Sequence, residues 1–510
     1  MTKMFNPSPQ QRDFFNWVSN GSGSCVLEAV AGSGKTTTLL QSLRLMRGSV
    51  FFGAYNKSVS LEITEKVKDD LSLDQSKIKV GTMHSAGFSN FRYHNKGVEV
   101  DDKKVFTIWC SILDSIKDED ERMRHHGMSS ALIKTVSIAK QRALGVIGKI
   151  EDKSQWESII EHFAIDSDLP EDIEPIELMR MSCRVLKESI SLNSRIIDFN
   201  DMIYAPLIED TPMYKVDWVL VDEAQDTNPA RRELAAKMLK PNGRLVAVGD
   251  RAQALYAFTG ADSNALDLIS KRFSATRLPL TVSYRCPKVV VEEAKNFVNH
   301  IESHEDSSEG TKREIVETEL LDQGLGSKDV ILCRFNKPLI DLAIQLTRKG
   351  VKLKIEGMDL SRALMNAIDK TKAVTIAELT QRLYLMKDSE KERLKGEGKE
   401  YKFAEIEDRI DSILSVSSAV ASKGGRSVSE VKQAIASLFA DNHSGSLTLS
   451  SVHKAKGKEW DRVFILGHNK FMPCKLAKLP WEKEVEKFIQ YVAVTRSKRE
   501  LVYVSVGGKE

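Results

Sequence analysis

The chain has 510 residues, of which 41% are hydrophobic and 29% charged, a composition that excludes a disordered protein and suits roughly three or four globular domains. Its net charge of +3 limits any nucleic-acid contact to local basic residues. No apolar run is long enough to cross a membrane, no signal-peptide core occurs, and the cysteines form no CxxC pair. We therefore expect a reduced, cytoplasmic setting, no membrane partner, and neither an iron–sulfur cluster nor a structural zinc site.

The N-terminal segment predicts a helix that starts at Pro9. Ser8 is a good N-cap, and Gln11 stands where the glutamine of a capping box belongs. The amide of Gln11 offers one acceptor and two donors, so it could instead read the edge of an adenine base. The sequence leaves both roles open, and the two could coexist.

A glycine-rich turn between an apolar run and a helical pattern is the strongest local signal in the chain. Cys25–Val30 indicates a strand and Thr36–Met46 a helix, so backbone N–H groups at a helix N-terminus would face a phosphate. Lys35 can reach the β- and γ-phosphates of a nucleotide, and the Thr36 hydroxyl can ligate Mg²⁺. Ala29 stands where the general phosphate-loop spacing has glycine, and a turn without a ligand is the alternative. The residues predicted to bind ATP here are Ala31, Gly32, Ser33, Gly34, Lys35, Thr36 and Thr37.

Strands and helices alternate after this loop, which predicts a parallel sheet covered on both faces. Ser49–Tyr55 and Ile78–Met83 are the next expected strands. From about 85 to 196 only helical spacing remains, so we expect a helical insertion there. Basic residues on one of its helices could touch a phosphate backbone, although a solvated basic face is the favoured alternative. They are Lys134, Lys140, Arg142 and Lys149.

An acidic pair follows the next apolar strand. Asp217–Val221 leads into Asp222 and Glu223, and carboxyl ends of strands are where such sheets present side chains to ligands. Asp222 would bind Mg²⁺ and Glu223 would orient or deprotonate the attacking water. The strand Leu245–Val248 is then followed by Gln253, which can bond a γ-phosphate oxygen. The alternative for the acidic pair is an ordinary polar helix start.

Two aromatic residues, Tyr256 and Phe258, lie shortly after Gln253. Aromatic faces beside a positive groove suit stacking on single-stranded bases. The alternative is that one or both rings belong to the core.

A second alternating series starts at Leu278–Ser283 and runs into Tyr284 and Arg285. An arginine donated from a second α/β domain to a bound nucleotide fits that position. The series lapses between about 357 and 446, which indicates a second, smaller insertion, and it resumes at Leu447–Ser451.

The motifs in this order resemble those of a superfamily-one DNA helicase of the UvrD/Rep/PcrA type. The segments that carry the resemblance include AVAGSGKT (29–36), VDEAQD (221–226), HKAKGKEW (453–460) and YVAVTR (491–496). The resemblance implies that Gln11 reads adenine, Tyr284 stacks on it and Glu459 holds the ribose. It implies that Arg285 and Arg496 contact the γ-phosphate, beside the catalytic set Lys35, Asp222, Glu223 and Gln253. The expected DNA contacts are Tyr55, Asn56, Thr82, His84, Tyr256, Phe258 and His453.

The implied fold is α/β, with two RecA-like P-loop NTPase domains that each carry a mainly helical insertion. The expected boundaries are 1–85 and 197–276 for the first motor domain, 86–196 for its insertion, 277–357 and 446–510 for the second motor domain, and 358–445 for its insertion. Thr259 and Phe258 replace the arginine and tryptophan common in the family, and Thr37 replaces an arginine often found there.

The implied activity is 3′→5′ movement on single-stranded DNA, with unwinding driven by ATP and Mg²⁺ between the two domains. The expected partners are single-stranded DNA and its junctions with duplex, in the cytoplasm of a bacterial or phage-infected cell; no protein partner is indicated. The short second insertion motivates an alternative, a translocase that strips proteins from single strands. A DNA-binding switch gated by ATP is a further alternative, although the intact catalytic residues argue against it.

Overall fold

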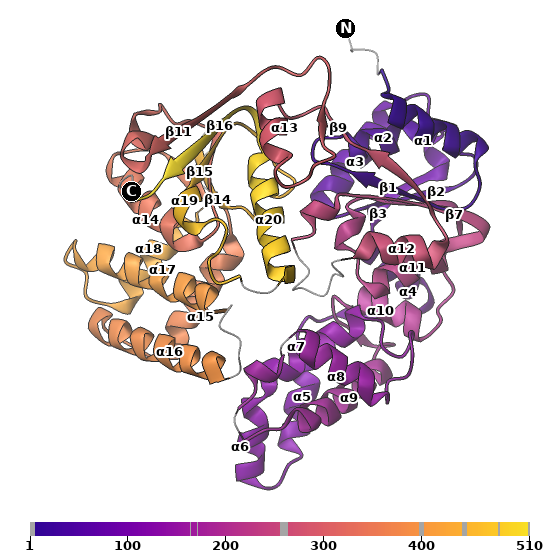
Figure 1. Ribbon diagram of the computed structural model, residues 1–510. Helices are drawn as coiled ribbons and strands as arrows, with labels where there is room; N and C mark the ends of the chain where they lie inside the picture. The colour runs from indigo at the N-terminus through magenta and orange to yellow at the C-terminus, as the bar shows by residue number, and fades with distance from the viewer. Residues whose placement is uncertain are drawn as a thin grey trace. The chain divides into compact units, whose positions relative to one another are not determined.

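The computed structural model describes residues 6–163, 165–170, 172–255, 264–396, 402–440, 446–477 and 480–507. The chain forms two compact units (Figure 1). Unit 1 comprises Met1–Val30 and Gly34–Leu280, and unit 2 comprises Ala31–Ser33 and Thr281–Glu510.

Unit 1 is built on a six-stranded sheet of order β3-β2-β6-β7-β1-β8, in which every pair of neighbours is parallel. Its strands are β1 (Cys25–Ala29), β2 (Val50–Ala54), β3 (Ile78–Thr82), β6 (Val216–Val221), β7 (Leu239–Gly249) and β8 (Thr276–Leu280). The helices that pack with this sheet are α1 (Pro9–Asn20), α2 (Lys35–Ser42), α3 (Lys57–Asp69), α4 (Met83–His94), α10 (Asp201–Ile208), α11 (Pro229–Met238) and α12 (Ala265–Phe273).

Strands β1, β2 and β6 of unit 1 are mostly apolar and almost fully buried, because both faces of the sheet are covered there. Successive side chains point to opposite faces, so the adjacent residues Phe51 and Phe52 belong to different cores. Phe51 joins the core under α4, α10 and α11, whereas Phe52 joins the core under α1, α2 and α3. Parallel strands bring the residues that follow β1, β6 and β7 to one edge of the sheet.

One expected boundary differs in the structure. Residues 278–283 were expected to open the second α/β domain, but β8 pairs with β1 over Thr276–Leu280. Unit 1 therefore extends to Leu280 rather than 276. Strand propensity does not specify which sheet edge will pair with the N–H and C=O groups of a strand, so the sequence could not assign β8 to a sheet.

The first insertion lies between β4 (Glu99–Val100) and β5 (Ile196–Ile197), which pair with each other. Its helices are α5 (Lys104–Asp114), α6 (Glu119–Gly127), α7 (Ser129–Gln141), α8 (Lys153–His162) and α9 (Pro175–Ser191). They enclose a core of their own around Trp109 and Trp156. The insertion therefore has a helical core of its own, to which Tyr204 of α10 also contributes.

A buried charge cluster lies where this insertion returns to the sheet. Lys140 Nζ lies 2.5 Å from Asp198 Oδ2 and 2.7 Å from Asp201 Oδ1, and Lys104 Nζ lies 2.8 Å from Asp201 Oδ2. Both lysines are essentially inaccessible to solvent. Lys140 is thus neither a phosphate contact nor part of a solvated basic face, because its charge is neutralised inside the protein.

Unit 2 contains a second six-stranded parallel sheet, of order β11-β16-β15-β12-β14-β13. Its strands are β11 (Thr311–Val316), β12 (Asp329–Cys333), β13 (Leu353–Ile355), β14 (Leu447–Ser451), β15 (Trp460–Leu466) and β16 (Ser497–Ser505). A short ladder joins β9 (Val282–Ser283) to β10 (Glu302–Ser303). The remaining helices of its motor part are α13 (Lys288–Ala294), α14 (Asn336–Arg348), α19 (His468–Phe471) and α20 (Pro480–Val494).

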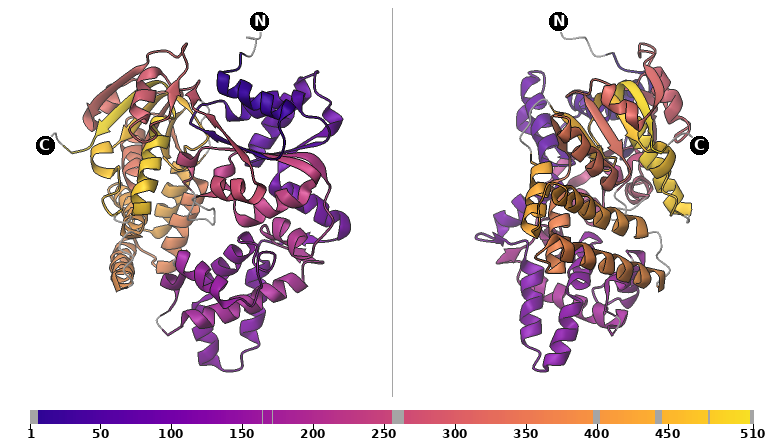
Figure 2. Two further views of the ribbon diagram at one scale, coloured as in Figure 1. Left: turned by 45° about the vertical axis from the view of Figure 1, so that its right-hand side comes forward. Right: turned by 90° about the vertical axis from the view of Figure 1, so that its left-hand side faces the viewer.

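The second insertion consists of α15 (Met358–Thr371), α16 (Ile376–Gly396), α17 (Phe403–Ala421) and α18 (Val428–Leu438). Unlike the first insertion, it shares one core with its sheet: Ile410 and Ile413 of α17 lie in the same cluster as Leu339 and Ile340 of α14. Figure 2 shows α16 and α17 as the long orange helices of unit 2. This insertion is an extension of the motor core.

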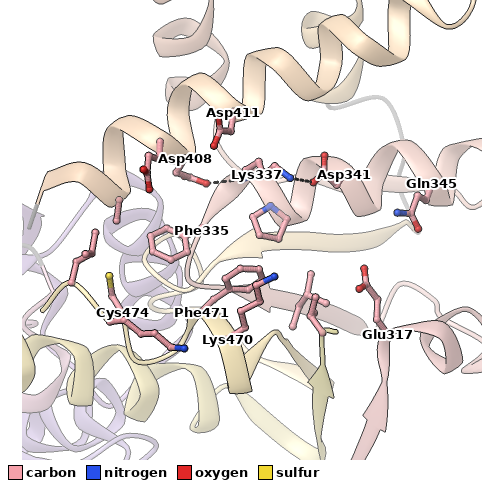
Figure 3. A pocket seen from close by; sticks show the side chains of 17 residues that line it. Glu317, Phe335, Lys337, Asp341, Gln345, Asp408, Asp411, Lys470, Phe471 and Cys474 are labelled. Carbon is pink, nitrogen blue, oxygen red and sulfur yellow. Dashed lines mark hydrogen bonds and ion pairs between the residues drawn. The ribbon is translucent and has the colours of Figure 1, made fainter. Parts of the chain in front are cut away.

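Asp408 of α17 connects the second insertion to helix α14. Its carboxylate accepts hydrogen bonds from the backbone N–H groups of Asn336 (2.9 Å) and Lys337 (2.7 Å), at the start of α14. A cavity of about 490 Å³ lies beside this junction, and Phe335 and Phe471 are among the residues that line it (Figure 3). Some of its charged side chains pair with each other, for example Lys337 with Asp341 at 2.7 Å.

Two parallel sheets, each with a mainly helical insertion, confirm the predicted fold class. Within the described ranges, no helix combines the length and apolarity that a membrane span requires.

Candidate nucleotide site and nucleic-acid face

The phosphate loop joins β1 to α2 in a conformation that depends on glycine. Gly32 and Gly34 have φ values of 73° and 74°, which L side chains rarely adopt. Gly34 is the N-cap of α2 and carries no side chain to cap it, so the first N–H groups of the helix are offered to an anion. Ser33 Oγ is buried with no hydrogen-bond partner among the described residues, as suits a phosphate-binding loop. Thr37 is exposed on α2.

The structure brings the phosphate loop to the acidic pair. Thr36 Oγ1 donates a hydrogen bond to Asp222 Oδ2 at 2.7 Å, and Lys35 Nζ lies 3.5 Å from Glu223 Oε1. Burial, and then the charge of Glu223, raises the pKa of Asp222 above its ordinary value. A divalent cation held by Asp222 and Thr36 would offset the cost of that buried charge, so these oxygen ligands fit Mg²⁺.

Glu223 occupies a strained position. Its backbone is left-handed, with φ 51° and ψ 44°, and its N–H donates to Asp222 Oδ1 at 2.9 Å. Non-glycine residues held in this region cost of the order of 1–3 kcal/mol and concentrate at functional sites. The Glu223 side chain keeps 25% of its surface exposed, so its carboxylate remains accessible to solvent.

Gln253 lies past the end of β7 and is almost fully buried. Its Nε2 donates to Asp250 Oδ2 at 2.7 Å. Burial raises the pKa of Asp250, although the Lys35 charge and this bond oppose the rise. Gln253 therefore lies on the same sheet edge as Asp222 and Glu223, at the end of the neighbouring strand.

Gln11 makes the predicted capping box on α1. Its backbone N–H donates to Ser8 Oγ at 3.2 Å and its Oε1 accepts from the Ser8 N–H at 2.9 Å. Its Nε2 also donates to Thr38 Oγ1 of α2 at 2.8 Å. The amide thus ties α1 to the phosphate-loop helix, and the adenine role stays a prediction.

In unit 2, the predicted nucleotide residues group around β9. Arg285 Nε lies 2.5 Å from Glu459 Oε2, so the expected arginine finger and ribose ligand are partners in one ion pair. Tyr284, which is 39% exposed, packs on His304, the residue after β10, with ring centroids 4.8 Å apart. Arg496 is buried and donates to the Val492 carbonyl at 3.0 Å.

Four predicted DNA contacts lie at or just after the ends of β2 and β3 of unit 1. Asn56 and Thr82 also have structural roles, because Asn56 Oδ1 caps α3 and Thr82 Oγ1 caps α4. Tyr55 is 38% exposed. Burial, helped by the Arg231 charge, lowers the pKa of His84 to about 3, so this ring is neutral at physiological pH.

Phe199 is an aromatic residue that the sequence analysis missed. It precedes α10, is 53% exposed, and stacks on His84 with ring centroids 4.1 Å apart. The sequence signal was present, since Phe199 is a large apolar residue between Asp198 and Asn200 in a polar turn. Only the fold shows that this turn lies against His84.

His453 follows β14 of unit 2. Burial, helped by the Arg334 charge, lowers its pKa to about 3, so His453 too is neutral. Arg334 follows β12, the neighbouring strand, and its Nε donates to Glu486 at 2.8 Å. Tyr256 and Phe258 lie outside the described residues.

Two parallel sheets of this kind, with a phosphate loop and an acidic pair at one sheet edge, define a P-loop NTPase. Two family models match the chain: UvrD/REP helicase N-terminal domain over residues 9–274 and UvrD-like helicase C-terminal domain over residues 365–507. The chain belongs to the UvrD/Rep helicase family, which confirms the resemblance and the RecA-like assignment of the two sheets.

Several curated relatives are ATP-dependent DNA helicases by name. The chain is 23% identical to ATP-dependent DNA helicase Rep of Escherichia coli (strain K12) over 304 residues, which are 58% of this chain and 43% of that protein. It is 25% identical to DNA helicase IV of the same strain over 328 residues, 55% of this chain and 46% of that protein. F-box DNA helicase protein 1 of Schizosaccharomyces pombe matches at 23% over 524 residues, 93% of this chain and 55% of that protein. The chain thus spans about half the length of these relatives.

Proposed function

We propose that this protein is an ATP-dependent DNA helicase that moves 3′→5′ on single-stranded DNA and unwinds duplex at junctions. The observation that carries the proposal is the meeting of Lys35 and Thr36 with Asp222 and Glu223 at one sheet edge. Family membership supports DNA as the substrate class.

In this proposal the chain's own residues divide the work of ATP hydrolysis. The phosphate loop holds the phosphates, and Lys35 neutralises their charge. Glu223, whose carboxylate is accessible, orients and deprotonates the attacking water. Mg²⁺ held by Thr36 and Asp222 would neutralise charge on the bound phosphates.

Arg285 and Arg496 of unit 2 are assigned to the γ-phosphate, with Glu459 and Tyr284 binding the ribose and adenine. An arginine finger is typically worth roughly 10³–10⁵ in rate. In the structure Arg285 Nε is paired with Glu459 Oε2, so two residues that the proposal assigns to the nucleotide lie in contact.

The proposed DNA face of unit 1 combines His84 and Phe199 with Tyr55. Neutral or apolar rings suit sequence-tolerant stacking on bases, because every base presents a π-face. His453 would contribute a further neutral ring from unit 2.

Strand displacement with two tailed duplexes tests the proposal. One duplex carries a 3′ single-stranded tail and the other a 5′ tail, and ATP hydrolysis is followed in parallel. We expect displacement only from the 3′ tail and hydrolysis stimulated by single-stranded DNA. Lys35→Ala and Glu223→Gln should abolish both signals with thermal unfolding unchanged. Normal turnover in either variant would overturn the assignment of the site.

A second candidate, a translocase that strips bound proteins and unwinds weakly, is favoured by the second insertion. That insertion is short and shares its core with the motor sheet, so it offers little separate surface for duplex. Strong DNA-stimulated hydrolysis without displacement from either tail would favour this candidate. A switch with little turnover is disfavoured, because a switch has no need of Glu223, Gln253 and both arginines.

A further inference from the structure

Gln225 joins the two catalytic strand ends of unit 1. It lies two residues beyond Glu223, after β6, and is 2% exposed. Its Nε2 donates to Glu223 Oε2 at 2.5 Å, and its Oε1 accepts from the backbone N–H of Asp250, after β7, at 3.1 Å. The Gln225 carboxamide therefore bonds both to Glu223, the candidate general base, and to the backbone of Asp250, three residues before Gln253.

We propose that Gln225 is a positioning residue for ATP hydrolysis. It orients the Glu223 carboxylate and links it to Gln253. This inference rests on the proposed ATPase function. The coupling continues through Asp250, whose carboxylate accepts from the Ala252 N–H at 3.0 Å and from Gln253 Nε2 at 2.7 Å. The bonds thus form one chain, Glu223–Gln225–Asp250–Gln253, across two neighbouring strands.

The chemistry of the link calls for an amide. Glu223 offers a carboxylate oxygen and needs a donor, whereas the Asp250 backbone offers an N–H and needs an acceptor. Among side chains of this length only glutamine supplies both at one end. A glutamate in its place could accept but, when ionised, could not donate, and it would add charge beside Glu223.

Gly249 is a second, independent observation. A Cβ built on Gly249 would lie 2.5 Å from Gln225 Oε1 and 3.0 Å from the Gln225 backbone nitrogen. The φ of Gly249 is not in the left-handed region, so backbone strain is not the reason for glycine there. The missing side chain instead leaves room for the Gln225 carboxamide to reach Asp250.

The positioning role also accounts for the backbone of Glu223. A left-handed glutamate persists only where its surroundings over-determine it. The Asp222 carboxylate bonds its N–H, and Gln225 bonds its carboxylate. Loss of the Gln225 bond would remove the hydrogen bond to Glu223 Oε2 and leave the Lys35 ion pair, on Oε1, to orient the carboxylate less tightly.

Steady-state ATPase kinetics on the full chain with saturating single-stranded DNA test this inference. Gln225→Ala should lower kcat about 10²-fold, as expected when a catalytic group is wrongly oriented. The KM for ATP should change less than about twofold. Gln225→Glu should not restore kcat, because an ionised glutamate offers Glu223 no donor. A purely structural role would not lower kcat while leaving KM unchanged.

Gly249→Ala should reproduce the kcat loss with Gln225 still present. The double variant Gly249→Ala/Gln225→Ala should be no slower than the slower single variant, because both changes break one link. Gln141→Ala in the first insertion is the matched control and should leave kcat unchanged. It removes a partly buried amide that donates a hydrogen bond to Ser137 Oγ.

Thermal unfolding of each variant distinguishes a wrongly oriented Glu223 carboxylate from a loss of the fold. If Gln225→Ala does not fold, the near-isosteric Gln225→Glu still tests the inference. Wild-type kcat in Gln225→Ala or in Gln225→Glu would overturn the positioning role alone. Absence of DNA-stimulated hydrolysis in the unsubstituted protein would instead overturn the proposed function, and the inference with it.

Discussion

Thr36 Oγ1 and Asp222 Oδ2 are joined by a hydrogen bond of 2.7 Å, although the two residues are 186 positions apart in the chain. The bond places a hydroxyl and a carboxylate side by side at the edge of the sheet. These are the ligand types that Mg²⁺ takes from proteins that bind nucleotides.

Mg²⁺·nucleotide should stabilise the protein more at pH 8 than at pH 5.5. Burial raises the pKa of Asp222, so the folded state binds more protons than the unfolded state as pH rises above 3.8, and stability falls until the carboxyl has ionised. The ionised carboxylate then gains most from a cation, whereas protons compete with the metal at low pH. The measurement is the rise in Tm with Mg²⁺ and a non-hydrolysable ATP analogue. Asp222→Asn should remove the pH dependence, and equal increments at both pH values would contradict the assignment.

Arg285→Ala should lower ATP turnover by about 10³-fold or more while nucleotide affinity changes little. The guanidinium stabilises the negative charge that develops in the transition state, so its loss lowers kcat. Arg285→Lys should not restore turnover, because a lysine offers a point charge without the planar fork. Single-turnover hydrolysis and fluorescent-nucleotide binding separate the two effects. Arg499→Ala, at an exposed arginine of unit 2, is the control, and wild-type turnover in Arg285→Ala would exclude this residue from the site.

Lys140→Met should destabilise the protein by about 3–5 kcal/mol, because it leaves Asp198 and Asp201 with an uncompensated buried charge. Urea unfolding measures the loss. Lys149→Met, an exposed lysine of the same insertion, should cost less than about 0.5 kcal/mol.

Adding Asp198→Asn to Lys140→Met should recover part of that stability. The double variant leaves Lys104 and Asp201 as a balanced pair, and the asparagine Oδ1 can still accept from the Asp201 N–H. A double variant less stable than Lys140→Met would show that the cluster does not act through charge balance.

Phe199→Ala should weaken single-stranded DNA binding roughly 5- to 150-fold, the range for losing one base-stacking ring. The dependence of affinity on salt should not change, because no phosphate contact is removed. Fluorescence anisotropy with a labelled oligothymidine at several salt concentrations provides both readouts. Phe106→Ala, an exposed ring on α5, is the matched control. Equal affinities in the two variants would remove Phe199 from the DNA face.

Local patterns predicted the phosphate loop, the acidic pair and the capping box of Gln11, because each depends on residues close together in the chain. Gly32, Gly34 and Lys35 lie within one turn, and the apolar runs around them identify buried parallel strands. The alternation of those runs with helical patterns was sufficient for the fold class and the existence of two insertions.

The tertiary structure determined the role of each residue whose partners lie far away in the sequence. Lys140 has the sequence context of a surface lysine, but two aspartates 58 and 61 residues later neutralise it in the interior. The sequence does not specify which sheet β8 belongs to, and its pairing with β1 places it in unit 1. Phe199 became a candidate DNA contact only because its turn packs against His84, and Gln225 a positioning residue only because β6 and β7 are neighbours. Hydrogen-bonding capacity and apolar periodicity are properties of the chain, whereas the partner that satisfies a buried charge or amide depends on which strands and helices become neighbours.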